Sequence, residues 1–201
     1  MATVSLNRIA KLRFREPVRN LPNYYTSDGI ERKFTYQFAK AYVSQFQKLH
    51  RTSDKNQIAV AREIPANGYG IADLVTVSWK SRKSIKTVSA QEFIAKRRPT
   101  TRAFEVKIYD WRKALMQANR YRFFSHTPIV VMPTSNVKQA LNFLQTFRLL
   151  AVGLWSFDIE TTQIIRHFTP RPSRPIDFTQ HLKVLSSVAK ANRGTKALPI
   201  S

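Results

Sequence analysis

Two acidic residues lie inside short apolar stretches: Asp73 in Ile-Ala-Asp-Leu-Val and Glu105 in Phe-Glu-Val-Lys-Ile. Successive side chains of a β-strand point to opposite faces, so Glu105 and Lys107 must share one face. If the two strands are neighbours, Asp73 joins them at the edge of the sheet. Magnesium takes two carboxylates from a protein before water and phosphate oxygens fill its other positions. The three residues therefore predict a site for a divalent cation and a phosphate group.

The structural alternative is a buried ion pair, in which Lys107 neutralises Glu105 or Asp73. Such a pair stabilises a fold little relative to apolar residues, because both charges lose their hydration. An enzyme that cuts phosphodiesters needs all three groups, so the complete set favours a functional site over an ion pair.

The net charge indicates the kind of partner. The chain has 34 Lys and Arg residues against 12 Asp and Glu residues, a formal charge of +22. Self-repulsion of this size calls for a polyanionic partner, and we expect nucleic acid. No apolar run approaches the roughly 18 residues of a membrane-spanning helix, so we expect no membrane partner.

Other absences narrow the class of protein. The amino end lacks the continuous apolar stretch of a secretory signal, and we expect a cytoplasmic protein. The chain contains no cysteine, which excludes disulfides, a thiolate zinc site and an iron–sulfur cluster.

The basic residues concentrate in the middle of the chain. The stretch from Lys80 to Arg122 holds many Lys and Arg residues but only three acids, Glu92, Glu105 and Asp110. A second basic stretch occupies 169–201. The expected nucleic-acid contacts are Lys80, Arg82, Lys83, Lys86, Lys96, Arg97, Arg98, Arg102, Lys113 and Arg120.

The periodicity of apolar residues predicts an α/β fold, a mixed sheet flanked by helices. Asp110 can cap one of the helices, and Ser135 or Asn136 another. We expect an irregular leader (1–29), one folded domain (30–168) and a basic tail (169–201). The expected helices are 30–50, 90–96, 111–124 and 137–149, and the expected strands are 58–64, 70–79, 102–109, 129–132, 151–157 and 161–168.

The order of these motifs resembles the PD-(D/E)XK nuclease superfamily. The matching elements are Asp73 in the second strand, Glu105-Val106-Lys107 in the third, and Gln117 with Tyr121 in the next helix. The Gln-x-x-x-Tyr motif is similar to that of the branch with recombination exonucleases and lambda-type exonuclease. The resemblance implies a restriction-endonuclease-like αβββαβ core, followed here by a helix and a strand pair. Ala72 replaces the proline that names the motif.

The resemblance implies a Mg²⁺-dependent deoxyribonuclease in which Mn²⁺ substitutes for Mg²⁺. An endonuclease is favoured over an exonuclease, and the mode of cutting stays open. Asp73, Glu105 and the Val106 carbonyl would hold the metal, with Glu31 or Glu63 as further candidates. Lys107 would orient the attacking water or stabilise the developing charge. Gln117 and Tyr121, which share one helix face, would contact the phosphate.

Three alternatives stay open. Sister branches of the superfamily include structure-specific junction resolvases and transposon-end-cleaving subunits, often acting as dimers. A homodimer or a larger nucleoprotein complex is therefore open as the assembled form, and a prokaryotic or phage-like source is expected. The third alternative is a DNA-binding protein on the same fold without catalysis.

Overall fold

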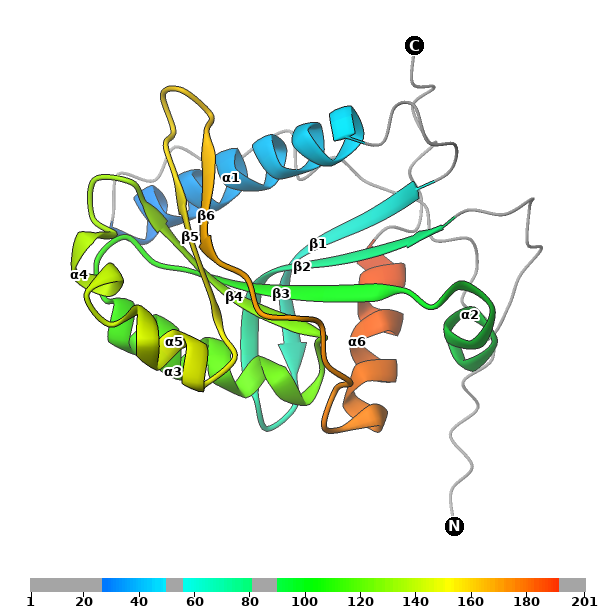
Figure 1. Ribbon diagram of the computed structural model, residues 1–201. Coiled ribbons are helices and arrows are strands. Elements are labelled where there is room, and N and C mark those ends of the chain that lie inside the picture. The colour runs from blue at the N-terminus through cyan, green and yellow to red at the C-terminus, as the bar shows by residue number, and fades with distance from the viewer. Residues whose placement is uncertain (1–26, 50–55, 81–89, 192–201) are drawn as a thin grey trace.

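A six-stranded sheet forms the centre of the molecule, with helices on both faces (Figure 1). The computed structural model describes residues 27–49, 56–80 and 90–191. The strands are β1 (Asn56–Ala66), β2 (Gly70–Lys80), β3 (Thr100–Val106), β4 (Thr127–Pro133), β5 (Gly153–Phe157) and β6 (Ile164–Phe168). The helices are α1 (Ser27–Leu49), α2 (Ala90–Arg97), α3 (Trp111–Arg120), the 3₁₀ turn η1 (Tyr121–Phe123), α4 (Lys138–Leu141), α5 (Leu144–Leu149) and α6 (Phe178–Ala191).

The strands follow one another across the sheet in sequence order, β1 to β6. Strands β1, β2 and β3 are antiparallel, β3, β4 and β5 run parallel, and β6 returns antiparallel to β5. The expected α/β class with a mixed sheet flanked by helices is confirmed. The expected pairing of the strands that hold Asp73 and Glu105 is also confirmed, because β2 and β3 are neighbours.

Helix α1 covers one face of the sheet with aromatic residues. Phe34, Phe38 and Tyr42 recur every four residues and are buried, which is the spacing of one helix face. The rings of Phe38 and Tyr42 each lie 5.3 Å from that of Phe104 on β3. This packing holds the first turns of α1 above the ends of the central strands.

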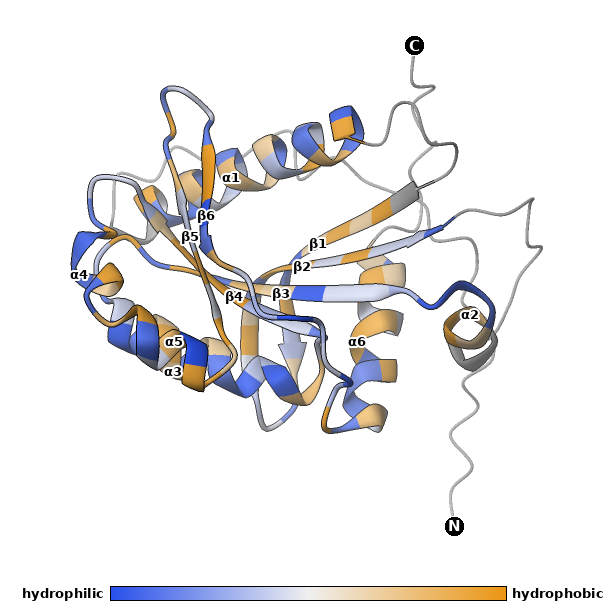
Figure 2. Cartoon of the chain, viewed as in Figure 1, coloured by the Kyte–Doolittle hydropathy of each residue, from blue (hydrophilic) through white to orange (hydrophobic). Residues whose placement is uncertain are grey.

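Helices α3 and α6 cover the opposite face, as Figure 1 shows beneath the sheet. Both helices turn apolar residues inward and polar residues outward (Figure 2). Asp110 caps α3 as expected, since its side chain accepts the Lys113 amide at 2.9 Å. The α-helix ends at Arg120 rather than Phe124, because the chain tightens into η1.

Helix α6 corrects the expectation of a basic tail from residue 169. Its residues Val184, Leu185 and Val188 are buried in the same core as α3. The segment from 178 to 191 therefore completes the fold. The basic residues between the apolar ones, such as Lys183 and Lys190, are exposed. They interrupt the apolar pattern in the sequence, so no helix was expected there.

The single helix expected over 137–149 is two short helices, α4 and α5, with a turn between them. Neither Ser135 nor Asn136 caps α4, whose first turn has no side-chain cap. Asn136 instead donates from Nδ2 to the Ile108 carbonyl at 2.9 Å. This bond ties the end of β4 to the loop that leaves β3, next to the predicted site.

Candidate functional site

The predicted site residues meet at the carboxyl end of β3. Leu74 on β2 pairs with Phe104 on β3, so the next step of this register sets Asp73 beside Glu105. Oδ2 of Asp73 accepts the backbone amide of Val106 at 2.7 Å. A side chain thus takes the place of a backbone partner at the point where the two strands separate.

Lys107 lies just beyond β3 and connects the two sides of the sheet. Its Nζ donates to Oε1 of Glu31 on α1 at 2.6 Å and lies 3.2 Å from Oε1 of Glu105. It also donates to the Val106 carbonyl at 3.3 Å. Burial disfavours the ammonium, but the hydrogen bond to Glu31 and the charges of Glu105 and Asp73 outweigh it and raise the pKa of Lys107.

Tyr121, the first residue of η1 directly after α3, contacts Glu105. It is 1% exposed, and its hydroxyl donates to the Ile71 carbonyl at 2.7 Å and contacts Oε2 of Glu105. Burial and the charge of Glu105 raise the pKa of Tyr121, so the hydroxyl keeps its proton. The Tyr121 hydroxyl thus has two acceptors for its single proton, the Ile71 carbonyl and the Glu105 carboxylate.

The pKa of Glu105 lies near neutral pH. Burial, followed by the repulsion of Asp73, raises the pKa of Glu105 to about 7, although Tyr121 and Lys107 oppose the shift. Burial also raises the pKa of Asp73. Two adjacent carboxyl groups that resist simultaneous ionisation are the arrangement that a divalent cation relieves.

Gln117 lies one turn before Tyr121 on the same face of α3. Its Oε1 atom is buried and has no hydrogen-bond partner among the described residues. Buried polar atoms in native proteins are nearly always satisfied, so an exception calls for an explanation. An acceptor left open beside Tyr121 suits a water molecule or a ligand that the structure does not contain.

Glu31 and Glu63 were expected as outside candidates, and both lie at the site. They line a cleft of about 200 Å³ together with Asp73. Glu63 has a left-handed backbone with φ of 52°, a conformation that costs a non-glycine residue about 1–3 kcal/mol and often occurs at functional sites. The ladder between β1 and β2 is interrupted there, directly opposite Asp73.

The oxygen atoms at the site are of the kind that bind a magnesium ion. Asp73, Glu105 and the Val106 carbonyl supply carboxylate and carbonyl oxygens, which are hard ligands of the kind Mg²⁺ prefers. Within the described ranges, no group of three or more His, Cys, Asp or Glu side chains is arranged to hold a metal ion. A Mg²⁺ ion held by these oxygens would therefore need water and substrate as its remaining ligands.

The expected nucleic-acid contacts fall in several places. Lys80 ends β2, Lys96 and Arg97 lie in the last turn of α2, and Arg98 follows. Lys80 lies seven positions after Asp73, roughly 23 Å of strand at about 3.3 Å per residue, so this group lies at the end of the sheet away from the carboxylates. Lys113 and Arg120 are exposed on α3, whereas Arg82, Lys83 and Lys86 lie outside the described residues.

Arg102 differs from the other expected contacts. Its side chain is half-buried, and Nη1 donates to the Tyr42 hydroxyl on α1 at 3.3 Å. It therefore faces the α1 side of the sheet rather than an open surface. The reason is the position of Arg102 within β3, since alternation along the strand directs it toward α1 together with Phe104.

Sequence reasoning missed two residues of the site, Arg32 and Arg62, which line the cleft with the acids. Arg62 occupies an inward position of β1, in line with the buried residues Ile58 and Val60. A charged residue at an inward strand position is the same signal that drew attention to Asp73 and Glu105. Applied to cations as well as acids, it would have found Arg62.

Comparison with known proteins gave no match: no protein-family model, curated protein or solved structure proved similar to the chain. The described helices also include none that is long and apolar enough to cross a membrane. Function is therefore inferred from the geometry and chemistry of the site itself.

Proposed function

We propose that this protein is a metal-dependent nuclease that hydrolyses phosphodiester bonds in DNA, with an endonuclease favoured over an exonuclease. The observation that carries the proposal is the convergence of Asp73, Glu105 and Lys107 at the end of β3. Two carboxyl groups and an ammonium from adjacent strands are the groups that metal-assisted phosphodiester hydrolysis requires.

Asp73, Glu105 and the Val106 carbonyl would hold one or two Mg²⁺ ions, and Mn²⁺ would substitute. Glu31 and Glu63 border the same space and are further candidate ligands. When bound, the ion supplies positive charge that offsets the charge developing on the phosphoryl group, and it lowers the pKa of the attacking water. Glu105, whose pKa burial raises to about 7, would hold the ion as its carboxylate.

Lys107 would stabilise the developing negative charge or orient the attacking water. An ammonium has three donors and no lone pair, so it binds water or phosphate oxygens but not a metal. Its present partners are Glu31 and Glu105. The same pairing keeps Lys107 charged and holds it at the end of β3, so its position is set before substrate arrives.

Tyr121 and Gln117 would complete the α3 side of the site. Tyr121 fixes the orientation of the Glu105 carboxyl group through its hydroxyl. The open acceptor of Gln117 would accept a hydrogen bond from a water molecule in the site. The role of Gln117 follows the expectation from the Gln-x-x-x-Tyr pattern, whereas the buried Tyr121 hydroxyl contacts Glu105 and not a phosphate.

The order of elements supports membership of that superfamily. Helix α1, strands β1 to β3, helix α3 and strand β4 follow one another as in an αβββαβ core, with α2 inserted before β3. The strand pair β5 and β6 then follows α4 and α5. We propose a restriction-endonuclease-like core on the strength of this order and of the site at the end of β3.

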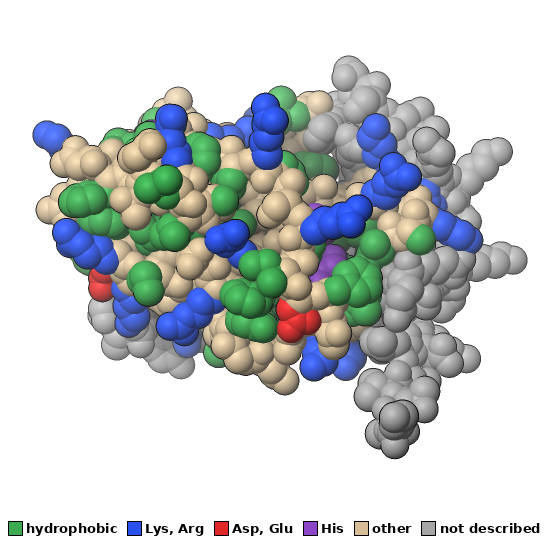
Figure 3. Space-filling view, turned by 60° about the horizontal axis from the view of Figure 1, so that its bottom comes forward, with side chains coloured by type: hydrophobic (Ala, Val, Ile, Leu, Met, Phe, Trp, Pro, Cys, Tyr) green, Lys and Arg blue, Asp and Glu red, His purple; other side chains and the backbone are tan. Residues whose placement is uncertain are grey.

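DNA is proposed as the substrate because of charge. Lys and Arg side chains are distributed over the face in Figure 3, on which acidic side chains are few. The group formed by Lys80, Lys96, Arg97 and Arg98 lies roughly 23 Å along the strands from Asp73. One turn of duplex DNA rises about 34 Å, so a duplex lying along β2 and β3 would reach both ends.

The test is to incubate the protein with supercoiled plasmid, linear duplex and single-stranded DNA in the presence of Mg²⁺, Mn²⁺ or EDTA. We expect cleavage of closed circles with either metal and none in EDTA. A Lys107→Ala preparation purified in parallel controls for contaminating nucleases. If wild-type protein binds these DNAs but cuts none of them with either metal, the nuclease proposal fails.

A further inference from the structure

The cleft beside the carboxyl groups is lined by cations as well as acids. Its walls come from the first turns of α1 and from the bent ends of β1 and β2, and its volume is about 200 Å³. That is several times the roughly 30 Å³ that one water molecule occupies in the liquid. The lining residues are Glu31, Arg32, Thr35, Arg62, Glu63 and Asp73.

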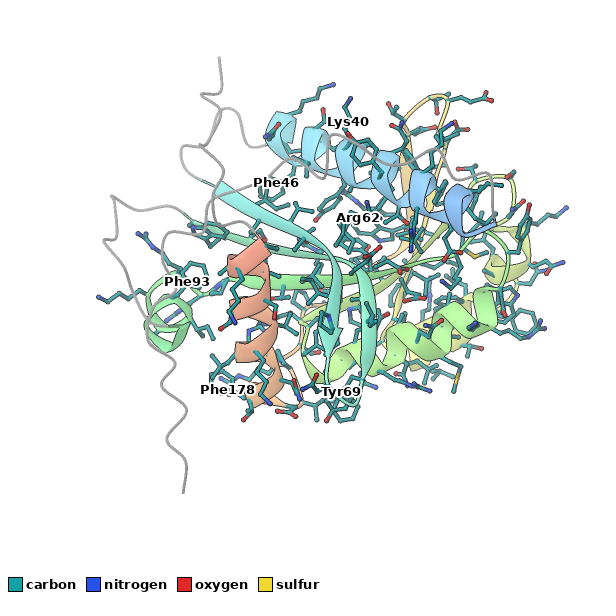
Figure 4. The ribbon with its side chains drawn as sticks, turned by 180° about the vertical axis from the view of Figure 1, so that it is seen from behind. Lys40, Phe46, Arg62, Tyr69, Phe93 and Phe178 are labelled. Carbon is teal, nitrogen blue, oxygen red and sulfur yellow. The ribbon has the colours of Figure 1, made fainter. Side chains whose placement is uncertain are left out.

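Arg62 is half-buried at a position where an apolar residue would suit the fold. It follows Ile58 and Val60 on the α1 side of β1, and its side chain is only 14% exposed. Figure 4 shows it between α1 and the bent ends of the strands. Taking a guanidinium out of water is costly unless the group is paired and hydrogen-bonded.

The described part of the chain supplies little compensation for Arg62. Its nearest ionic partner is Glu63, at 3.6 Å from Nη2, and that carboxylate is 60% exposed. An exposed pair of this kind contributes about 0–1 kcal/mol. The Nε–H group is buried and has no hydrogen-bond partner among the described residues. A guanidinium has five donors, and the Nε–H group is a donor that a ligand in the cleft could use.

Arg32 offers a second cation on the α1 wall of the same cleft. Thr35, by contrast, donates its hydroxyl to the Glu31 carbonyl at 2.8 Å within the helix, so it brings no free donor. The cleft thus presents two guanidinium groups beside the acids. A planar guanidinium binds two oxygens of one phosphate in parallel, which an ammonium cannot do.

We infer that Arg62, with Arg32, forms a phosphate subsite for a backbone phosphodiester next to the one presented to Asp73 and Glu105. That the ligand is a DNA phosphodiester rests on the proposed nuclease function. That the ligand is an anion rests on the guanidinium of Arg62 alone. A small free anion would meet the repulsion of Glu31, Glu63 and Asp73. A backbone phosphate is held in addition by the basic residues elsewhere on the protein, so it tolerates those neighbours.

The direct test observes the Nε–H resonance of Arg62 by NMR in EDTA, assigned by its loss in Arg62→Lys. The probes are a single-stranded oligothymidylate long enough to reach the basic residues elsewhere on the protein, and inorganic phosphate. We expect the oligothymidylate to shift the Arg62 resonance and inorganic phosphate to shift it less. A resonance unmoved by the oligothymidylate, or moved by inorganic phosphate alone, overturns the subsite.

The second test measures how salt weakens the binding of a short duplex in EDTA. We expect Arg62→Gln to reduce the log–log salt slope by about 0.9, the value for one lost phosphate contact. Arg62→Lys keeps the charge and should keep the slope, but it should bind severalfold more weakly because it lacks the planar donor pair. Lys40→Gln is the matched control, since Lys40 lies on α1 and points away from the sheet (Figure 4).

Thermal unfolding of each variant establishes that it is folded. Equal slopes for Arg62→Gln, Lys40→Gln and wild type overturn the subsite. Both tests are made in EDTA and do not depend on cleavage. If the Arg62 results are as expected but plasmid DNA stays intact with Mg²⁺ and Mn²⁺, the nuclease proposal fails while the phosphate subsite stands. If plasmid is cut but the Arg62 resonance and the salt slope of Arg62→Gln are unchanged, the phosphate subsite fails while the nuclease proposal stands.

Discussion

Nζ of Lys107 lies 2.6 Å from Oε1 of Glu31, so the residue after β3 is joined to the first turns of α1. The same ammonium lies 3.2 Å from Oε1 of Glu105. Helix α1 and strand β3 are therefore connected through one cation at the site. A helix on the opposite face from α3 thus contributes a charged group to the carboxyl pair of β2 and β3.

The first prediction concerns this cation. Lys107→Ala should reduce cleavage of plasmid DNA by about a hundredfold or more, because it removes the charge that stabilises the transition state. Binding of the same DNA should change by less than threefold, as measured by fluorescence anisotropy in EDTA. Lys138→Ala, on the exposed surface of α4, is the control and should cut normally. Normal cutting by Lys107→Ala would remove this residue from the mechanism.

The second prediction separates the charge of Asp73 from its structural bond. Asn keeps an oxygen that can accept the Val106 amide, whereas Ala does not. Asp73→Asn should therefore stay as stable as wild type yet lose cleavage and weaken Mn²⁺ binding measured by calorimetry. Asp73→Ala should lose about 1–3 kcal/mol of unfolding free energy as well. If the Asn variant cuts DNA at the wild-type rate, Asp73 has only the structural role.

The third prediction concerns the hydroxyl of Tyr121. Tyr121→Phe removes the hydroxyl that hydrogen-bonds the Ile71 carbonyl and Oε2 of Glu105, and we expect a loss of about 1–3 kcal/mol in unfolding free energy. Urea denaturation in EDTA measures it. Tyr109→Phe, at a residue 78% exposed, should change stability by less than about 0.5 kcal/mol. Equal effects of the two substitutions would argue against a buried hydroxyl network.

Most elements of the fold could be predicted because their patterns are local. The spacing of Phe34, Phe38 and Tyr42 predicts α1, and Asp110 announces the start of α3. The division of 137–149 into two helices could not be foreseen. Asn136, which suits a helix cap in sequence, makes its hydrogen bond to Ile108 instead. That choice depends on a loop 28 residues away.

The candidate site could be predicted where a charged residue occupies a strand position that is otherwise apolar. Asp73 and Glu105 are acids at inward positions, and their register on adjacent strands brings them together. The partner of Lys107 could not be read in the same way. Glu31 is an ordinary acid near the start of a helix, and only the packing of α1 on the sheet carries it to the ammonium.

The fourth prediction is a loss of stability in mild acid that arises from a histidine pair. The rings of His126 and His181 lie 5.0 Å apart. His126 accepts the Thr101 amide through Nδ1, and His181 lies 2.7 Å from the Phe124 carbonyl. Burial, and then the neighbouring His181, lower the pKa of His126 to about 4, and burial lowers the pKa of His181.

Both groups are neutral in the folded protein where unfolded histidine, with a pKa near 6.5, is charged. The unfolded chain then binds more protons, so the pair's contribution is present above about pH 6.5 and is lost as the pH falls toward 4. Each histidine adds up to about 1.4 kcal/mol per pH unit. Asn keeps a hydrogen-bonding group near the position of the histidine Nδ1 atom but does not titrate. The double variant His126→Asn and His181→Asn should therefore show a shallower fall of unfolding free energy between pH 6.5 and 4, measured by urea titrations. An unchanged slope would assign the acid sensitivity to carboxylates.

The fifth prediction tests whether α6 belongs to the core. Leu185 is 1% exposed and packs in the core that includes Ala61 on β1 and Leu115 on α3. Leu185→Ala should cost about 2–5 kcal/mol of unfolding free energy, because it leaves a cavity between α6 and the sheet. Lys183→Ala, at an exposed position of the same helix, should change stability by less than about 0.5 kcal/mol. If residues 178–191 were a basic tail outside the core, the two variants would have the same unfolding free energy. If α6 is a core helix, Leu185→Ala is less stable than Lys183→Ala, and residues 178–191 unfold in the same cooperative transition as the sheet that holds Asp73.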